Sequence, residues 1–349
     1  MPIRQFVAAA LATVVLAGCA TPAQPAGTAS VTTTTPTQSK KLTVITHDSF
    51  ALADETVARF KSDTGYDVTF VAPGDAGTVV NQLVLTKDAP LADVVFGIDN
   101  TFAGRAVDAG VLTPYSSPAL PADAAALAAD DRNSLTPVDY GDVCLNADTA
   151  WFKAHKIAVP ETLDDLLKPE YKDQLVVANP ASSSPGLAFL IATVGAKGDP
   201  GYLDYWTALK ANGVQVVKGW TEAYTVEFSG SSGKGSRPLV LSYASSPAYE
   251  PATEALVRTC FRQVEYAGVI AGTQNEVGAR AFVDFLLSDE VQKQIPETMY
   301  MNPVDSSVGL PEDWKQNAAV VTAPIEVSVA DIAAHRDQWI KAWTATVIG

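Results

Sequence analysis

Two short stretches of the sequence place aromatic rings beside carboxylates and hydroxyls. One is KGWTEAY at 218–224, directly after a β-branched run, and the other is SYASSPAY at 242–249. Ring faces carry negative electrostatic potential, and a cation held over such a face gains roughly 0.5–2 kcal/mol. The pattern therefore predicts a slot for a flat, positively charged ligand. The alternative is that the same aromatics fill a hydrophobic core, where large rings are common.

The elements that precede these stretches indicate how a ligand site would be positioned. Apolar periodicity predicts strands and helices in alternation, at 42–46, 53–61, 68–72, 78–86 and 93–97. A β-α-β-α-β order favours a parallel sheet with right-handed crossovers. Ligands of such sheets lie beyond the carboxyl ends of the strands, where the loops after the three strands meet.

Two longer strands are expected at 136–146 and 261–267, and we interpret them as crossings between two lobes. A helix is predicted to begin at 162–167 behind a Thr cap, and a final amphipathic helix at 329–343. Another helix is predicted with Ser184 at its cap and Pro185 as its first helical residue. The start of this helix either offers amides and hydroxyls to an anion or is simply capped.

The N-terminus predicts export. Residues 1–19 combine Arg4 with an apolar segment too short to span a bilayer. The segment ends in LAGC, which resembles the bacterial lipobox, and by that resemblance Cys19 becomes the lipid-carrying N-terminus. The alternative is an ordinary signal peptide with an incidental Cys. Residues 20–40 are rich in Thr, Pro, Ser and Ala and predict a disordered tether.

Composition narrows the classes of function. The length beyond the tether suggests two lobes rather than one ordinary domain. The net charge of −15 argues against a nucleic-acid partner. The three histidines are not spaced as metal ligands, so no metal site is expected. If Cys19 is lipidated, Cys144 and Cys260 remain as an even pair in an oxidising compartment, and a disulfide between them is expected.

Beyond the two aromatic stretches, the sequence carries an ordered set of short motifs. They are HDSF at 47–50, Asp75 in a Gly-rich turn, DVV and GIDN within 93–100, DYG at 139–141, SSSPGL at 182–187, KGWTEAY at 218–224, LSY and SPAY within 241–249, and QVE at 263–265. This set resembles the substrate-binding subunits of thiamine ABC importers, which are two-lobed periplasmic binding proteins of type II. The motifs are collinear and cover nearly all of residues 41–345.

The resemblance implies an α/β fold in which each lobe is a mixed, mostly parallel sheet flanked by helices. Lobe 1 would comprise residues 41–138 plus 264–349, and lobe 2 residues 139–263. The resemblance further implies a monomeric receptor that uses no cofactor and catalyses no reaction. It would pass thiamine or a thiamine phosphate to ABC permease and ATPase subunits at the outer face of the cell membrane, where the lipid anchor holds it.

Roles for the ring-binding residues follow from the same resemblance. Trp220, Tyr243 and Tyr249 would stack on the thiamine rings. Asp75 would accept a hydrogen bond from the exocyclic amine of the aminopyrimidine.

The remaining residues would hold the other end of the ligand. Ser183 and Ser184 would bind the hydroxyethyl group or a phosphate on it, and the pocket would also be lined by Ser245 and Ser246. Relatives carry Tyr and Trp where His47 and Tyr300 stand, near the phosphate end. The preference among thiamine and its phosphates therefore stays open.

Other functions fit part of the pattern. Thiaminase I has a related fold and attacks thiamine with a Cys, so Cys144 is a candidate nucleophile, with Asp139, Asp142 or Glu265 as its base. A polyamine receptor would also use aromatics and carboxylates. A ferric-iron receptor would use an adjacent Tyr-Tyr pair, which the sequence lacks.

Overall fold

The computed structural model of the chain describes residues 40–349. The predicted export signal, Cys19 and all but the last residue of the tether lie outside the described residues. In the described part, no helix is both long and apolar enough to cross a membrane.

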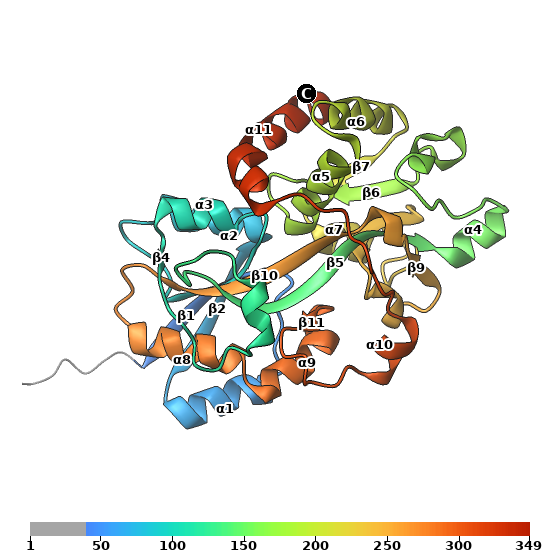
Figure 1. The fold of residues 1–349 in the computed structure, drawn as a ribbon. Helices are drawn as coiled ribbons and strands as arrows, with labels where there is room; N and C mark the ends of the chain where they lie inside the picture. The colour runs from blue at the N-terminus through green and yellow to red at the C-terminus, as the bar shows by residue number, and fades with distance from the viewer. Residues whose placement is uncertain (1–39) are drawn as a thin grey trace, which may run out of the picture. The chain divides into compact units, whose positions relative to one another are not determined.

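Strands and helices alternate along much of the described chain (Figure 1). The strands are β1 (Lys41–His47), β2 (Asp67–Gly74), β3 (Val94–Asp99), β4 (Leu112–Thr113), β5 (Thr136–Asp148), β6 (Leu175–Ala178), β7 (Gln215–Val217), β8 (Leu239–Tyr243), β9 (Thr253–Ala255), β10 (Phe261–Ile270) and β11 (Asn302–Pro303). The α-helices are α1 (Asp54–Thr64), α2 (Ala76–Leu85), α3 (Ala103–Ala109), α4 (Thr149–His155), α5 (Ser184–Lys197), α6 (Gly201–Ala211), α7 (Trp220–Glu222), α8 (Glu276–Leu286), α9 (Asp289–Met299), α10 (Glu312–Asn317) and α11 (Val329–Val347).

All strands belong to one sheet, whose main order is β2-β1-β3-β10-β5-β8-β6-β7. Three short strands lie off this path: β4 pairs with β10, and β9 and β11 pair with β5. Strands β2 and β3 flank β1 in parallel, which confirms the predicted β-α-β-α-β unit. Helices α1 and α8 lie on one side of this unit and α2 and α3 on the other (Figure 1). Because both faces are covered, β3 is buried along its whole length.

The two predicted crossing strands are present as β5 and β10. They pair antiparallel from Phe261 opposite Val143 to Ala267 opposite Thr136. On their outer sides β10 pairs with β3 and β5 with β8, so the two strands join the β1–β3 part of the sheet to the β6–β8 part. Figure 1 shows them running side by side through the middle of the molecule.

The part of the sheet beyond β5 is again parallel, because β6 pairs in parallel with both β7 and β8. Helix α5 packs against it, α6 packs on α5, and α11 packs on α6. The rings of Trp206 and Trp343 meet edge to face at 5.4 Å, and Trp339 Nε1 donates to Asp199 at 3.1 Å. The predicted lobe boundaries place α11 in lobe 1, whereas these contacts tie it to a helix of lobe 2; the boundaries themselves stay a prediction.

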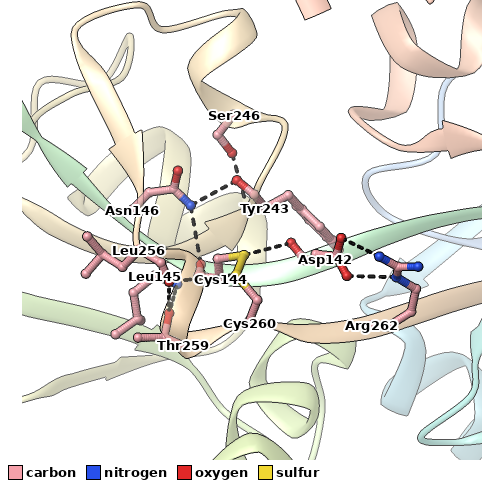
Figure 2. Close-up of a disulfide and its surroundings, with 10 residues drawn as sticks. All are labelled: Asp142, Cys144, Leu145, Asn146, Tyr243, Ser246, Leu256, Thr259, Cys260 and Arg262. Atoms are coloured by element: carbon pink, nitrogen blue, oxygen red, sulfur yellow. Dashed lines mark hydrogen bonds and ion pairs between the residues drawn. A yellow bond between two sulfur atoms is a disulfide. The ribbon is translucent and has the colours of Figure 1, made fainter. Parts of the chain in front are cut away.

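Cys144 on β5 and Cys260 just before β10 lie with their sulfur atoms at a bonding distance of 1.98 Å (Figure 2). Both cysteines are fully buried. The Asn146 side-chain amide, next to this pair, donates to the carbonyls of Cys144 (3.3 Å) and Tyr243 (3.0 Å). The cysteine pair therefore lies beside the strand that carries one of the predicted site residues.

Two local predictions differ from the structure. The helix expected at 162–167 is only a 3₁₀ turn at Asp165–Leu167, because the Asp165 carboxylate accepts from the Thr162 amide and hydroxyl and so closes a tight turn. Pro169 follows within two residues and disfavours helical continuation. The cap of α5 is Ser183 rather than Ser184, and its Oγ accepts from the Gly186 amide at 3.4 Å.

Candidate ligand-binding cleft

An inner pocket lies where the first β-α-β unit meets the aromatic stretches. Its walls come from strand ends, helix starts and the turn after α9. The lining residues are His47, Ser49, Asp75, Pro185, Trp220, Tyr243, Glu265, Met299 and Met301. Four of the ten predicted ligand-binding residues are among them, namely His47, Asp75, Trp220 and Tyr243.

Aromatic rings form a continuous group around this pocket. Trp220 stacks on Tyr224 at 5.1 Å with an interplanar angle of 13°. It meets Tyr243 edge to face at 6.1 Å and Tyr300 at 6.0 Å. Tyr300 in turn contacts Tyr249 at 4.2 Å. The rings that the sequence placed in separate stretches therefore gather at one cleft.

Local structure fixes the orientation of Trp220. The short helix α7 begins at Trp220 and continues into a π-helical turn at Ala223–Glu227, a rare geometry that is frequent at functional sites. The indole Nε1 donates to Ser242 Oγ at 3.0 Å, and Ser242 Oγ lies 2.8 Å from Ser246 Oγ. Ser246 Oγ also accepts from the Tyr243 amide at 3.3 Å, so one chain of hydroxyls links the Trp220 indole to the backbone of Tyr243.

Asp75 closes the pocket from the opposite side as the N-cap of α2. Its Oδ1 accepts from the amides of Ala76 at 2.7 Å and Ser184 at 3.3 Å. Its Oδ2 accepts from the Trp220 amide at 3.4 Å. Burial raises the pKa of Asp75. The carboxylate therefore faces the rings and already links α2 to the two segments across the cleft.

An outer pocket shares Asp75 with the inner one and opens between α2 and α7. Ser182, Lys218 and Thr221 line it from one side, and Asp48 from the other. The outer pocket has a volume of about 270 Å³, whereas the inner pocket has about 20 Å³. Small-molecule sites span roughly 300–1,000 Å³. The inner walls are thus in contact, and a two-ring ligand can enter only if they separate.

The predicted serines lie behind the pocket wall. Ser183 and Ser184 are buried at the start of α5, where Pro185 rather than either serine lines the inner pocket. Ser246 supports Trp220 and Tyr243 as described above. Ser245 Oγ donates to the Tyr300 carbonyl at 2.6 Å and so fixes the turn after α9.

Tyr249 and Tyr300 form the far end of the aromatic group. The Tyr249 hydroxyl accepts from Trp314 Nε1 at 2.7 Å and donates to the Pro296 carbonyl. Tyr300 is the left-handed residue that ends α9, with φ of 62°. Neither side chain lines the inner pocket in this conformation. Tyr249 reaches Trp220 only through Tyr300.

His47 occupies the end of β1 and faces Glu265, with Nε2 3.4 Å from Oε2. A Cβ on Gly97 would lie 2.0 Å from His47 Cδ2, so only glycine permits this ring position. The positive φ of 88° at Gly97 favours glycine as well.

Five pocket residues were not among the predicted ligand-binding residues: Ser49, Pro185, Glu265, Met299 and Met301. Ser49, Pro185 and Glu265 belong to the motifs HDSF, SSSPGL and QVE. Met299 and Met301 carried no signal, because they reach the pocket only through the turn at Tyr300. Gly141 lets Met301 approach, since a Cβ there would lie 2.8 Å from its sulfur.

Cys144, the alternative nucleophile, does not line the pocket. Its side chain is fully buried, and its sulfur lies against Cys260. A disulfide sulfur is not a thiolate and cannot attack a substrate in this state. Within residues 40–349, no group of three His, Cys, Asp or Glu side chains is arranged to hold a metal ion.

A mixed sheet crossed by two central strands, with a ring-lined cleft beside them, defines a solute receptor of the type II periplasmic-binding-protein class. Residues 89–324 match the family described as bacterial extracellular solute-binding protein, and the chain belongs to this family.

The chain is 30% identical over 319 residues to the thiamine-binding periplasmic protein of Escherichia coli strain K12, covering 88% of this chain and 93% of that one. It is 28% identical over 322 residues to the thiamine-binding periplasmic protein of Brucella abortus, covering 87% and 91% of the two chains. A solved periplasmic thiamin binding protein superposes with a TM-score of 0.77 at 29% identity, covering 88% of this chain and 96% of that one.

Proposed function

We propose that this protein captures thiamine, or one of its phosphate esters, and delivers it to an ABC importer. The observation that carries the proposal is the inner pocket, which Trp220, Tyr243 and Asp75 line together. Ring faces suit a planar cationic heterocycle, and a carboxylate suits an amine donor. The similar thiamine-binding periplasmic proteins support the same ligand.

In the proposed complex, the thiamine rings insert beside Trp220 and Tyr243. Tyr249, which contacts Tyr300 in this conformation, stacks on the thiamine rings once the cleft opens. Asp75 accepts a hydrogen bond from the aminopyrimidine amine. The start of α5, with Ser183 and Ser184, faces the hydroxyethyl end or its phosphate. Ser245 and Ser246 act indirectly, because their hydroxyls hold Tyr300, Trp220 and Tyr243 in place.

Capture requires the cleft walls to separate and close again. We assign this motion to bending where the two predicted lobes, 41–138 plus 264–349 and 139–263, meet at β5 and β10. The protein acts as a monomeric receptor without catalysis, and permease and ATPase subunits receive its ligand. Ligand binding shifts the open–closed equilibrium by the difference in affinity of the two states.

A calorimetric panel tests the proposal. Thiamine, its mono- and diphosphate, and putrescine are titrated separately into the purified protein at micromolar concentration. We expect saturable binding of thiamine or a phosphate ester, with a change in tryptophan fluorescence. No heat and no fluorescence change with any thiamine compound would remove the assignment. Stronger binding of putrescine would establish the polyamine alternative instead.

Membrane attachment is a separate proposal. Cys19 carries a lipid that holds the receptor at the outer face of the cell membrane, and residues 20–40 act as a tether. Cells expressing the full chain are fractionated after labelling with an alkyne fatty acid. The native chain should be labelled and membrane-bound, while Cys19→Ser should lose the label and leave the membrane. An unlabelled native chain would contradict the anchor.

A further inference from the structure

Glu265 lies at the centre of the sheet, between two other acids. On β10 it pairs directly with Asp99 on β3 and with Asp139 on β5. Residues directly opposite on neighbouring strands share one face of a sheet. The three carboxyl groups therefore form a row across three adjacent strands. Glu265 is the member of this row that lines the inner pocket, although it is only 4% exposed.

Two N–H groups hold the Glu265 carboxylate. Gln263 Nε2 donates to Oε1 at 2.9 Å, and His47 Nε2 lies 3.4 Å from Oε2. The other ring nitrogen of His47, Nδ1, accepts from the Ser49 amide at 3.1 Å, so we place the ring proton on Nε2. Burial lowers the pKa of His47, but Glu265, together with the charges of Asp75 and Asp48, more than reverses this. A second proton would have to go on Nδ1, which the Ser49 amide faces.

The two flanking acids differ from Glu265. Asp139 is fully buried, and neither of its oxygens has a hydrogen-bond donor among the described residues. Burial, and then the charge of Glu265, raise the pKa of Asp139 well above its ordinary value. Burial likewise raises the pKa of Asp99 to about 7. Burial therefore favours the neutral form of both flanking acids, and Glu265 is the member of the row that reaches the pocket.

Within residues 40–349, the inner pocket gives Glu265 no basic side chain apart from His47. Among the described residues, the lining of the inner pocket contains no Lys or Arg. Asp75, the other carboxylate, already accepts from three backbone amides. A buried carboxylate without a full positive partner is costly, and a cationic ligand removes that cost.

We propose that Glu265 is the counter-ion of the ligand's cationic ring and determines the preference for a charged over a neutral heterocycle. His47 and Gln263 are positioning residues that hold this carboxylate toward the pocket. The inference rests on the proposed function, since it assigns one ring of thiamine to one side chain.

Binding of thiamine and of deazathiamine, whose neutral thiophene replaces the thiazolium, separates charge from shape. Calorimetry of the wild type and of Glu265→Gln with both compounds gives a ratio of affinities. We expect Glu265→Gln to weaken thiamine binding by at least about tenfold, as expected for a lost charged partner, and deazathiamine binding by less than about threefold. Glu254→Gln, which removes the same charge from an exposed position on β9, is the matched control.

A second variant covers the event that Glu265→Gln does not fold. His47→Phe keeps an aromatic ring against Phe96 but removes the donor to Glu265. It should lower the thiamine-to-deazathiamine ratio in the same direction by a smaller factor. A ratio unchanged from the wild type in every folded variant would overturn the inference and leave the thiamine assignment intact. A wild type that binds neither compound would overturn both.

Discussion

Asp75 and Trp220 are joined across the cleft by a hydrogen bond from the Trp220 amide to Oδ2 of the carboxylate, 3.4 Å long. Asp75 belongs to the first β-α-β unit, whereas Trp220 begins the helix after β7. The same carboxylate also accepts from the Ser184 amide. The group proposed to bind the ligand amine therefore also holds the cleft closed. Entry of a ligand must exchange some of these contacts for new ones.

The first prediction concerns Asp75→Asn. Asn keeps the N-cap of α2, because Asn and Asp are comparable caps. It loses the charge that strengthens a hydrogen bond from an amine, worth about 1.5–3 kcal/mol. We expect thiamine affinity to fall by about 10- to 100-fold in calorimetry. Because Nδ2 of Asn cannot accept from the Trp220 amide, one cross-cleft bond is lost, and we expect a small fall in the thermal midpoint. Affinity within threefold of the wild type would show that the amine lies elsewhere.

The second prediction separates the contribution of the Trp220 ring face from that of its Nε1 hydrogen bond. Trp220→Phe keeps a ring face but loses the Nε1 bond to Ser242, and Trp220→Ala loses both. We expect Trp220→Ala to weaken thiamine binding by roughly tenfold or more and Trp220→Phe by a smaller factor, since stacking and cation–π contacts contribute about 0.5–2 kcal/mol. Equal losses in the two variants would assign the effect to the hydrogen bond instead.

The sequence predicted the framework of the cleft better than its lining. Strands β1, β3, β5 and β10 were expected because their apolar and β-branched runs are local signals. Met299 was missed because only the left-handed turn at Tyr300 brings it to the pocket, and no local pattern marks that turn. Glu265 was expected only as part of a motif and as a possible base for Cys144, not as a ligand-binding residue. Its exposure to the pocket depends on the register of β10 with β3 and β5, which no local pattern specifies.

The third prediction concerns the cysteine pair. The bond closes a loop between residues 116 positions apart, and such bonds contribute typically about 2–4 kcal/mol. The variant Cys144→Ala/Cys260→Ala leaves alanines in an apolar cluster with Ala244 and Val321. We expect its free energy of unfolding in urea to be lower by about this amount.

Reduction of the wild type with dithiothreitol is the control for the cysteine variant. It should reproduce the loss of stability in the wild type and have no effect on the double variant. Peptide mass spectrometry without reduction should recover the two cysteines in one linked peptide pair. Two free thiols in the exported protein would contradict the bond.

The fourth prediction is a dependence of stability on pH that arises from Asp99. Its carboxylate accepts from the Thr101 hydroxyl at 2.9 Å and the Phe102 amide at 3.2 Å. Burial nevertheless raises its pKa to about 7 in the folded state, from 3.8 when unfolded. Between these values the folded chain binds more protons than the unfolded chain, so this group destabilises the fold as pH rises from about 4 to 7.

Comparison of the wild type with Asp99→Asn isolates this effect, because Asn can still accept from the Phe102 amide and pair with the Thr101 hydroxyl. The contribution is at most about 1.4 kcal/mol per pH unit within the window. We expect urea unfolding at pH 5 and pH 7.5 to show the variant gaining stability relative to the wild type as pH rises. A constant difference between the two proteins across this range would mean that Asp99 does not change its protonation there. Asp139 would then be the next acid in the row to replace, since burial raises its pKa as well.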